Sequence, residues 1–339
     1  MQVNRQALLL SLEQVSPGLS TVRETVEQSS CFVFHEGEVI TFNDEIACTT
    51  KTPIEGIEGA VPAAPLMALL SKLAEEDINV TIEEGEFRIA GAGRRGGLRM
   101  AEEVLLPIQK VERPKNWQPL DESFCEAVTI VQQCAGNDVD KFLLTCIHLN
   151  PEFVEACDNY QMARYPVPVA IRRPTLVKRD AIKHITGLDM AEIAETKNWV
   201  HFRNPAGLVL SCRRYMEDFP DLSGTLEKKG GTQITLPGGM AEAIDKADVL
   251  SSENSENNQI TVKLAPGRMA IRGQGTLGWW EERKKVGYDG PSMSFLISPK
   301  LMTEICKRHN ECEITDGADL LRVNGGKFVY VSCLGVADE

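Results

Sequence analysis

An amphipathic helical pattern that returns at a fixed interval is the feature that most constrains the fold of this 339-residue chain. Apolar residues recur at the three- and four-residue spacing of a single helix face in segments 8–15, 124–131 and 240–247. Successive copies begin 116 residues apart in both steps. One amphipathic helix is common by chance, but three at one interval predict a repeated domain of about that length.

Each repeat carries a second helical stripe, followed by short runs with strand-like alternation around polar turns. The second stripes lie at 66–73, 182–185 and 301–305. Two amphipathic helices and several half-buried strands predict an α+β domain with both helices on one face of a sheet. A proline-bracketed linker at 113–119 and a glycine-containing one at 227–232 separate the repeats. We therefore predict three similar tandem domains, at residues 1–115, 118–227 and 232–339.

Composition limits the function classes. Asp and Glu number 49 against 36 Lys and Arg, so the net charge is −13, which disfavours a uniformly basic nucleic-acid binder but leaves local basic surfaces open. The ten cysteines contain no C-x-x-C pair and the five histidines form no ligand pattern with them, so we expect no disulfide, metal or cofactor. With no long apolar run and no signal-like start, we expect a cytoplasmic protein.

Familiar catalytic motifs do not occur in the sequence. There is no G-x-x-x-x-G-K-[ST], H-E-x-x-H or G-x-S-x-G. The glycine-rich run 91–97 is interpreted as a hairpin turn, because no apolar helix follows it as a phosphate site would require. Trp279 and Trp280 could stack on a base, although a packed strand is more typical. We predict a binding protein and no enzyme; a hidden site with a reactive cysteine thiolate is the alternative.

Several short motifs, in order along almost the whole chain, resemble the bacterial DNA polymerase III beta subunit, the DNA sliding clamp. Residues 3–15 resemble the opening helix of that family, and A-V-P-A at 60–63 and T-L-V-K-R at 175–179 resemble entries to its inner helices. The segment D-F-P-D-L at 218–222 is similar to its F-P-D-Y element, and residues 155–163 resemble its A-T-D-G-H-R-L-A segment. The divergence is compatible with a phage or prophage origin.

The resemblance implies the DNA clamp fold and a head-to-tail homodimer that closes into a ring. Two helices per domain would lie on the inner face of the sheets. The function implied is that of a processivity factor, which encircles double-stranded DNA without reading its sequence, is placed there by a clamp loader and tethers the DNA polymerase catalytic subunit. The alternative is a clamp-like accessory or decoy that binds replication or transcription partners without encircling DNA.

The DNA-facing residues are the basic residues of the predicted helical segments together with one loop arginine, whereas the pocket and dimer residues are matched to the family by position. The predicted helical segments contain nine basic and seven acidic side chains, a better balance than that of the whole chain. The expected DNA-facing residues are Arg5, Arg23, Lys72, Lys178, Arg179, Lys183, Lys246, Lys300, Lys307 and Arg308. The expected partner-peptide pocket is Leu143, Cys157, Asn159, Tyr160, Met162, Pro220, Thr225, Val331, Ser332, Cys333 and Leu334. The expected apolar dimer contacts are Val249 and Leu250.

Two departures from the family fall on this pocket. The D-G-H-R segment of the family is D-N-Y-Q at 158–161, which removes a glycine and a basic residue. The family ending M-P-M-R-L is replaced by V-S-C-L at 331–334 and the tail 335–339. The resemblance therefore supports a ring more strongly than it identifies the peptide bound.

Overall fold

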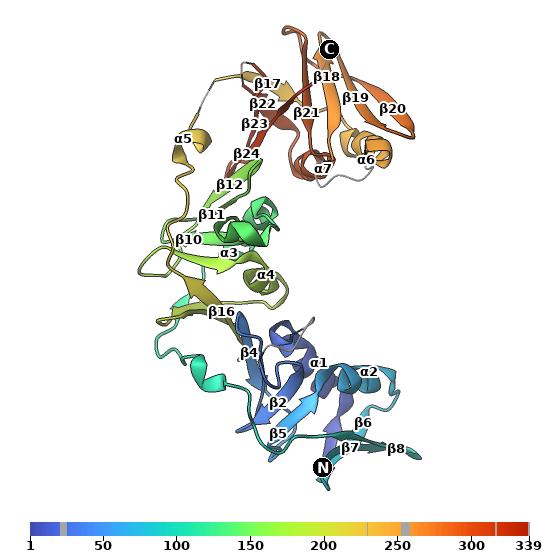
Figure 1. Cartoon of the computed structure of the whole chain (residues 1–339), viewed down its shortest axis with the longest axis vertical. Helices are drawn as coiled ribbons and strands as arrows, with labels where there is room; N and C mark the ends of the chain where they lie inside the picture. Colours follow the sequence, from blue (N-terminus) through green and yellow to red (C-terminus); the bar gives the residue numbers. More distant parts are fainter. Residues whose placement is uncertain (21–25, 229, 252–257, 316, 338–339) are drawn as a thin grey trace. The chain divides into compact units, whose positions relative to one another are not determined.

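A computed structural model describes residues 1–20, 26–228, 230–251, 258–315 and 317–337 (Figure 1). The chain divides into two compact units. One comprises residues 1–132, 137–154 and 167–219, and the other comprises 133–136, 155–166 and 220–339. The paired strands that carry the fold run antiparallel, and in the described ranges no helix is long and apolar enough to cross a membrane.

The first 115 residues form two groups of strands with two helices. Their elements are β1 (Gln2–Asn4), α1 (Arg5–Val15), η1 (Ser16–Gly18), β2 (Cys31–His35), β3 (Glu38–Phe42), β4 (Ile46–Lys51), β5 (Gly59–Pro62), α2 (Ala63–Lys72), β6 (Asp77–Glu83), β7 (Glu86–Gly91), β8 (Arg94–Arg99) and η2 (Ile108–Lys110). Asn4 caps α1 by accepting a hydrogen bond from the Ala7 amide at 2.9 Å. Leu8, Leu12 and Val15 bury the helix face that the sequence pattern predicted.

The next hundred residues repeat this plan with shorter helices. Their elements are β9 (Gln118–Pro119), α3 (Phe124–Val131), η3 (Gln132–Cys134), η4 (Val139–Thr145), β10 (Cys146–Asn150), β11 (Phe153–Cys157), β12 (Gln161–Pro166), β13 (Thr175–Lys178), α4 (Arg179–Ile182), η5 (Lys183–Gly187), β14 (Glu192–Glu195), β15 (Trp199–Arg203) and β16 (Val209–Tyr215). Strand β16 pairs with β4, so one sheet runs from the first expected domain into the second.

The remaining residues form the bulk of the second unit. Their elements are α5 (Ser223–Leu226), β17 (Thr232–Thr235), α6 (Met240–Ser251), β18 (Ile260–Ala265), β19 (Arg268–Gly275), β20 (Gly278–Lys285), β21 (Met293–Ile297), α7 (Pro299–Arg308), β22 (Glu311–Ile314), β23 (Leu320–Asn324), β24 (Val329–Cys333) and β25 (Gly335–Val336). One five-stranded sheet has the order β20-β19-β18-β21-β25. Helix α6 packs closely on this sheet at Gly273. A Cβ atom at that position would lie 1.8 Å from the Ala247 carbonyl oxygen, so the close approach requires glycine.

Helices form at each of the predicted amphipathic stripes. The three first stripes lie in α1, α3 and α6, and the second stripes lie in α2, in α4 with η5, and in α7. The glycine-rich run forms the β7–β8 hairpin, with Gly93 at φ +73° in its two-residue loop. The prediction that Trp279 and Trp280 pack against other residues was wrong. Both lie in a strand, but β20 is the edge of its sheet, so their side chains are 60% and 42% exposed.

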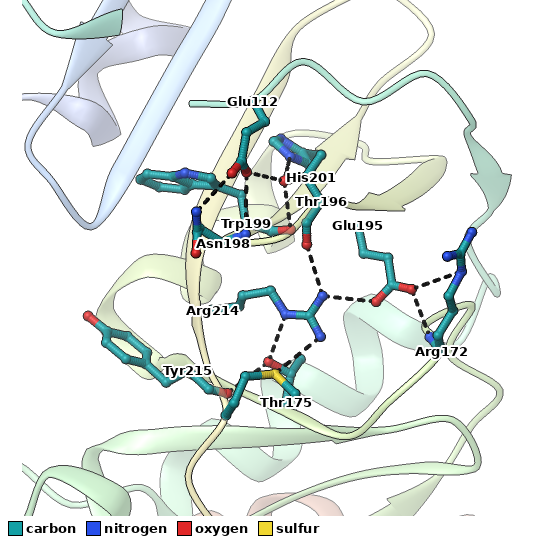
Figure 2. A network of polar contacts seen from close by, with 11 residues as sticks. Glu112, Arg172, Thr175, Glu195, Thr196, Asn198, Trp199, His201, Arg214 and Tyr215 are labelled. Carbon is teal, nitrogen blue, oxygen red and sulfur yellow. Dashed lines mark hydrogen bonds and ion pairs between the residues drawn. The ribbon is translucent and has the colours of Figure 1, made fainter. Parts of the chain in front are cut away.

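A polar network fixes the linker that follows η2 to the strands of the second repeat (Figure 2). The carboxylate of Glu112 accepts hydrogen bonds from Thr196 Oγ1 and Asn198 Nδ2, both at 2.8 Å. Buried His201 lies 3.0 Å from the same Thr196 hydroxyl and 2.7 Å from Ser211 Oγ. Because Thr196 donates its proton to Glu112, its oxygen is free to accept from His201 Nε2, and the Ser211 hydroxyl can donate to Nδ1 of a neutral ring. The network therefore accommodates a neutral imidazole.

Acid is expected to weaken the first unit through His201. Burial lowers the pKa of this imidazole to about 4, despite the nearby Glu112, so the folded state favours the neutral ring. Its contribution to stability is complete above the unfolded pKa near 6.5 and is lost as pH falls toward the folded pKa. From pH 7.5 to 5.0 the expected loss in unfolding free energy is about 2 kcal/mol. Urea unfolding of the wild type and His201→Gln at both pH values tests this; equal losses in the two proteins would contradict it.

Candidate DNA-facing helices and peptide-binding surface

The predicted DNA-facing residues of the first repeat lie at opposite ends of two helices. Arg5 opens α1, and its guanidinium donates to the carbonyl oxygens of Glu75 at 2.8 Å and Leu70 at 3.1 Å. Arg5 therefore provides hydrogen-bond donors for one carbonyl group in the last turn of α2 and one in the segment after it. Lys72 is exposed in the last turn of α2. Arg23 lies outside the described residues.

Three predicted cations gather at the start of α4. The Lys178 ammonium lies 2.8 Å from Glu45 Oε1, and the same carboxylate accepts from the Tyr215 hydroxyl. Arg179 donates to Asn137 Oδ1 at 2.6 Å, and Lys183 lies 3.0 Å from Asp180 Oδ1. Lys178 thus ties β13 to the turn before β4, whereas Lys183 is exposed and pairs with Asp180, one turn earlier.

The carboxylate of Asp180 is held in its charged form by these neighbours. Its partial burial alone would raise its pKa, but hydrogen bonding from Lys183 and the charge of Arg179 bring the pKa below its usual value. The start of α4 is therefore a mixed-charge surface at neutral pH, where the Asp180 carboxylate partly balances the charge of Lys183.

The third repeat presents its cations from α6 and α7, which lie side by side (Figure 1). Lys246 of α6 lies 3.0 Å from Glu282 of β20. Lys300 is exposed at the start of α7, and Lys307 pairs with Glu304 one turn earlier at 3.3 Å. Arg308 is the last residue of α7. Exposed pairs of this kind are weak, so phosphate groups can compete for their lysines.

Most of the predicted pocket residues come together in the second unit. Strand β12 pairs with β24, which places Met162 opposite Val331, and the Cys333 amide donates to the Tyr160 carbonyl at 2.7 Å. Tyr160 is 50% exposed, Met162 is half-buried and Val331 is buried. Helix α5 packs against both strands and carries Thr225. The structure thus provides a partly apolar surface beside an exposed aromatic ring.

The other predicted pocket residues are divided between the two units. Ser332 is buried in β24 and Leu334 follows it half-buried; Cys157 is buried at the end of β11, and Pro220 is exposed before α5. Leu143 lies half-buried in η4, in the first unit.

The divergent D-N-Y-Q segment is shaped by its own aspartate. Asp158 Oδ1 accepts from the amides of Tyr160 at 2.7 Å and Gln161 at 2.9 Å, and Gln161 Nε2 donates to Asp158 Oδ2 at 3.0 Å. Asn159, where the family has glycine, does not take a left-handed backbone conformation. The turn therefore forms without the glycine. Gln161 stands where the family has a basic residue, and its Nε2 donates to the Gln133 carbonyl at 2.9 Å.

An ion pair that the sequence did not indicate fixes α5 beside this surface. Arg164 Nε lies 2.7 Å from Glu155 Oε2, and its two terminal nitrogens lie 3.3 Å from Ser223 Oγ. The Glu155 side chain is 3% exposed and that of Arg164 18%. A buried carboxylate needs such a partner, and the pair joins β11, β12 and α5. Strand alternation places Arg164 but does not reveal its partners, which lie 9 and 59 residues away.

The predicted dimer contacts lie at the end of α6. Val249 is 71% exposed and Leu250 is half-buried. Within the described part of the chain, His, Cys, Asp and Glu side chains form no group of three or more that could hold a metal ion.

Neither family models nor curated proteins match this chain in sequence. Solved structures match over nearly its whole length. The DNA polymerase III subunit beta of Pseudomonas aeruginosa, a sliding clamp, has a TM-score of 0.82 at 17% identity and 99% coverage of both chains. The beta subunit of Thermotoga maritima has a TM-score of 0.82 at 15% identity, and the DNA polymerase sliding clamp of Bacillus subtilis 0.81 at 14%, each with 99% coverage of both chains. The chain therefore has the fold of the bacterial DNA polymerase III beta subunits, the DNA sliding clamps.

Proposed function

We propose that this protein is a sliding clamp: a DNA polymerase processivity factor that encircles duplex DNA as a head-to-tail homodimer. The observation that carries the proposal is the structural match to sliding clamps over 99% of both chains. Three domains per copy would give a ring of six, with the helices inside and the sheets outside. The ring would tether the polymerase catalytic subunit, and a clamp loader would open it.

The proposed action needs no covalent chemistry. Exposed lysines such as Lys183 and Lys307 would meet phosphate groups in any sequence, and neighbouring carboxylates would keep each contact short-lived. A ring that holds DNA by topology gains from weak contacts, because strong ones would slow sliding. The chain as a whole has a net charge of −13, which would limit adhesion of DNA to the rest of its surface.

The alternative of a thiol enzyme has little support from the cysteines. Burial raises the pKa of Cys48 to about 12 and that of Cys146 to about 11, so both thiols carry their protons at neutral pH. Cys333, the exposed one of the ten, also has a raised pKa because of its partial burial.

The dimer is expected to fail when a charge is placed at the end of α6. Leu250→Asp would desolvate a carboxylate without a partner in the proposed joint, which costs several kcal/mol. The variant should sediment as a folded monomer at concentrations where the wild type is a dimer. Asp248→Leu, two residues earlier in the same last turn of α6, controls for effects of any substitution in that turn. A folded Leu250→Asp protein that remains dimeric would place the joint elsewhere.

A further inference from the structure

The turn between β14 and β15 brings together two segments that lie outside the helices proposed to face DNA (Figure 2). From the linker that follows η2, the Glu112 carboxylate accepts hydrogen bonds from the side chains of Thr196 and Asn198 in that turn. From the loop before β13, the Arg172 amide donates to Glu195 Oε1 at 3.0 Å. The linker, the turn and the loop therefore lie side by side, and all three belong to the first unit.

The carboxylates at this junction are engaged by neighbouring groups. Glu195 lies 3.0 Å from Arg214 Nη1, and the two side chains are only 15% and 8% exposed. Glu112 accepts a further hydrogen bond from the Asn198 amide at 3.3 Å. Glu38, at the start of β3, pairs with Arg113 of the linker at 2.9 Å. Each of these negative groups therefore helps to hold the junction together.

Basic side chains from the same segments remain at the surface. Arg172 is 90% exposed, and its neighbour Arg173 and the turn residue Lys197 form no ion pair with other described residues. The basic turn surface, as we call this group, consists of the exposed residues Lys110, Arg113, Lys115, Arg172, Arg173 and Lys197. Its six cations outnumber the three carboxylates, although the whole chain has a net charge of −13. A positive surface on an acidic protein attracts anionic partners.

Hydrogen bonds hold the basic turn surface in place before any partner binds. Trp199 Nε1 donates to the Lys110 carbonyl at 3.1 Å, and Arg214 Nη1 donates to the Thr196 carbonyl at 3.0 Å. Pro174 restricts the backbone of Arg173, which precedes it. Because the backbone that carries these cations is already ordered, binding costs little additional ordering free energy.

The aromatic residues of these segments favour a protein partner over single-stranded nucleic acid. Proteins hold single strands on exposed aromatic rings that stack on the bases. Here Trp199 is buried, and the Arg203 guanidinium lies over the half-buried Trp117 ring, 4.4 Å from its centroid. Guanidinium groups such as those of Arg172 and Arg173 instead match carboxylates, which accept two parallel hydrogen bonds from one arginine.

We propose that the basic turn surface binds an acidic segment of a partner protein, with Arg172, Arg173 and Lys197 as its main contacts. It is a second protein-binding surface, in addition to the surface around Met162, and it selects Asp and Glu side chains where the other accepts an apolar anchor. The binding does not depend on the proposed ring, because every contributing residue lies in one unit of one copy.

A labelled oligoglutamate peptide tests the proposal by fluorescence anisotropy at low salt. Arg173→Glu combined with Lys197→Glu should weaken peptide binding at least tenfold, because both side chains are exposed and would then repel the peptide. Lys263→Glu combined with Arg268→Glu makes the same change in net charge at exposed residues of the second unit and should leave binding unchanged. A wild type that does not bind the peptide, or equal losses in the two variants, would overturn the proposal.

A milder variant covers the case in which the charge reversal does not fold. Arg173→Gln combined with Lys197→Gln removes the two charges without adding repulsion, and it should still weaken the peptide at least threefold. Full peptide binding by this variant would overturn the proposal.

Nucleic-acid probes separate a protein partner from DNA. Labelled single-stranded and duplex oligonucleotides should bind the Arg173→Gln, Lys197→Gln protein as they bind the wild type. Loss of oligonucleotide affinity with peptide affinity kept would overturn the proposal and identify a nucleic-acid surface. Retention of the same variant on circular DNA reports on the proposed clamp function separately and should be unchanged.

Discussion

Replacing Lys183, Lys300 and Lys307 with glutamate is expected to lower the affinity for a short duplex at low salt by more than tenfold. Each ring would lose six positive charges and gain six negative ones along its proposed channel. Because phosphate binding releases counterions, the slope of log affinity against log salt should shrink by about 0.9 for every phosphate group that the protein no longer neutralises. Affinities for duplexes of unrelated sequence should fall equally.

A matched control separates local charge from net charge in this experiment. Lys51, Lys115 and Lys197 are exposed and lie outside the predicted helices, and changing all three to glutamate alters the total charge identically. That protein should keep most of its affinity. If both triple variants bind equally well, or lose affinity equally, these helices are not the DNA-facing surface.

Peptide binding is expected to be abolished by Met162→Glu. Met162 is half-buried opposite Val331, at the centre of the surface that we assign to partner peptides. A carboxylate there would be desolvated by an apolar peptide anchor. Truncation of a central interface residue commonly costs about 2 kcal/mol or more, so a loss of at least about 100-fold is expected with the added charge. Fluorescence anisotropy with a labelled peptide from a polymerase catalytic subunit measures it.

Two further proteins make this result specific. Tyr160→Ala removes the exposed ring beside Met162 and should weaken the same peptide without altering the dimer. Met216→Glu changes an exposed methionine in the first unit and should bind normally. Full binding by a folded Met162→Glu protein would mean that this divergent surface does not serve the role it has in the family.

The helical repeat was accessible from sequence because it rests on local periodicity. The buried faces of α1, α3 and α6 follow directly from apolar spacing, and the β7–β8 turn follows from its glycines. The clamp fold was accessible because short motifs keep their order over almost the whole chain. These signals involve residues close together in the chain, or a period that repeats.

Contacts between distant residues were not accessible in this way. Lys178 carries the charge that a DNA-facing residue would have, but its partner Glu45 lies 133 residues earlier, and no local pattern links them. The exposure of Trp279 depends on which strand ends the sheet, and a strand pattern is the same at an edge as in the interior. The Arg164–Glu155 pair was not predictable for the same reason, because it depends on which strands are neighbours in the sheet.

Retention on circular DNA tests the proposed ring most directly. A clamp loaded by its loader onto nicked circular DNA should stay bound through gel filtration at moderate salt, and cutting that DNA once should release it, because a topological ring slides off open ends. A closed ring should show stable retention on the circle and rapid loss after linearisation. Equal retention on both forms, or binding to neither by a monomeric protein, would contradict it and favour a clamp-like accessory that does not encircle DNA.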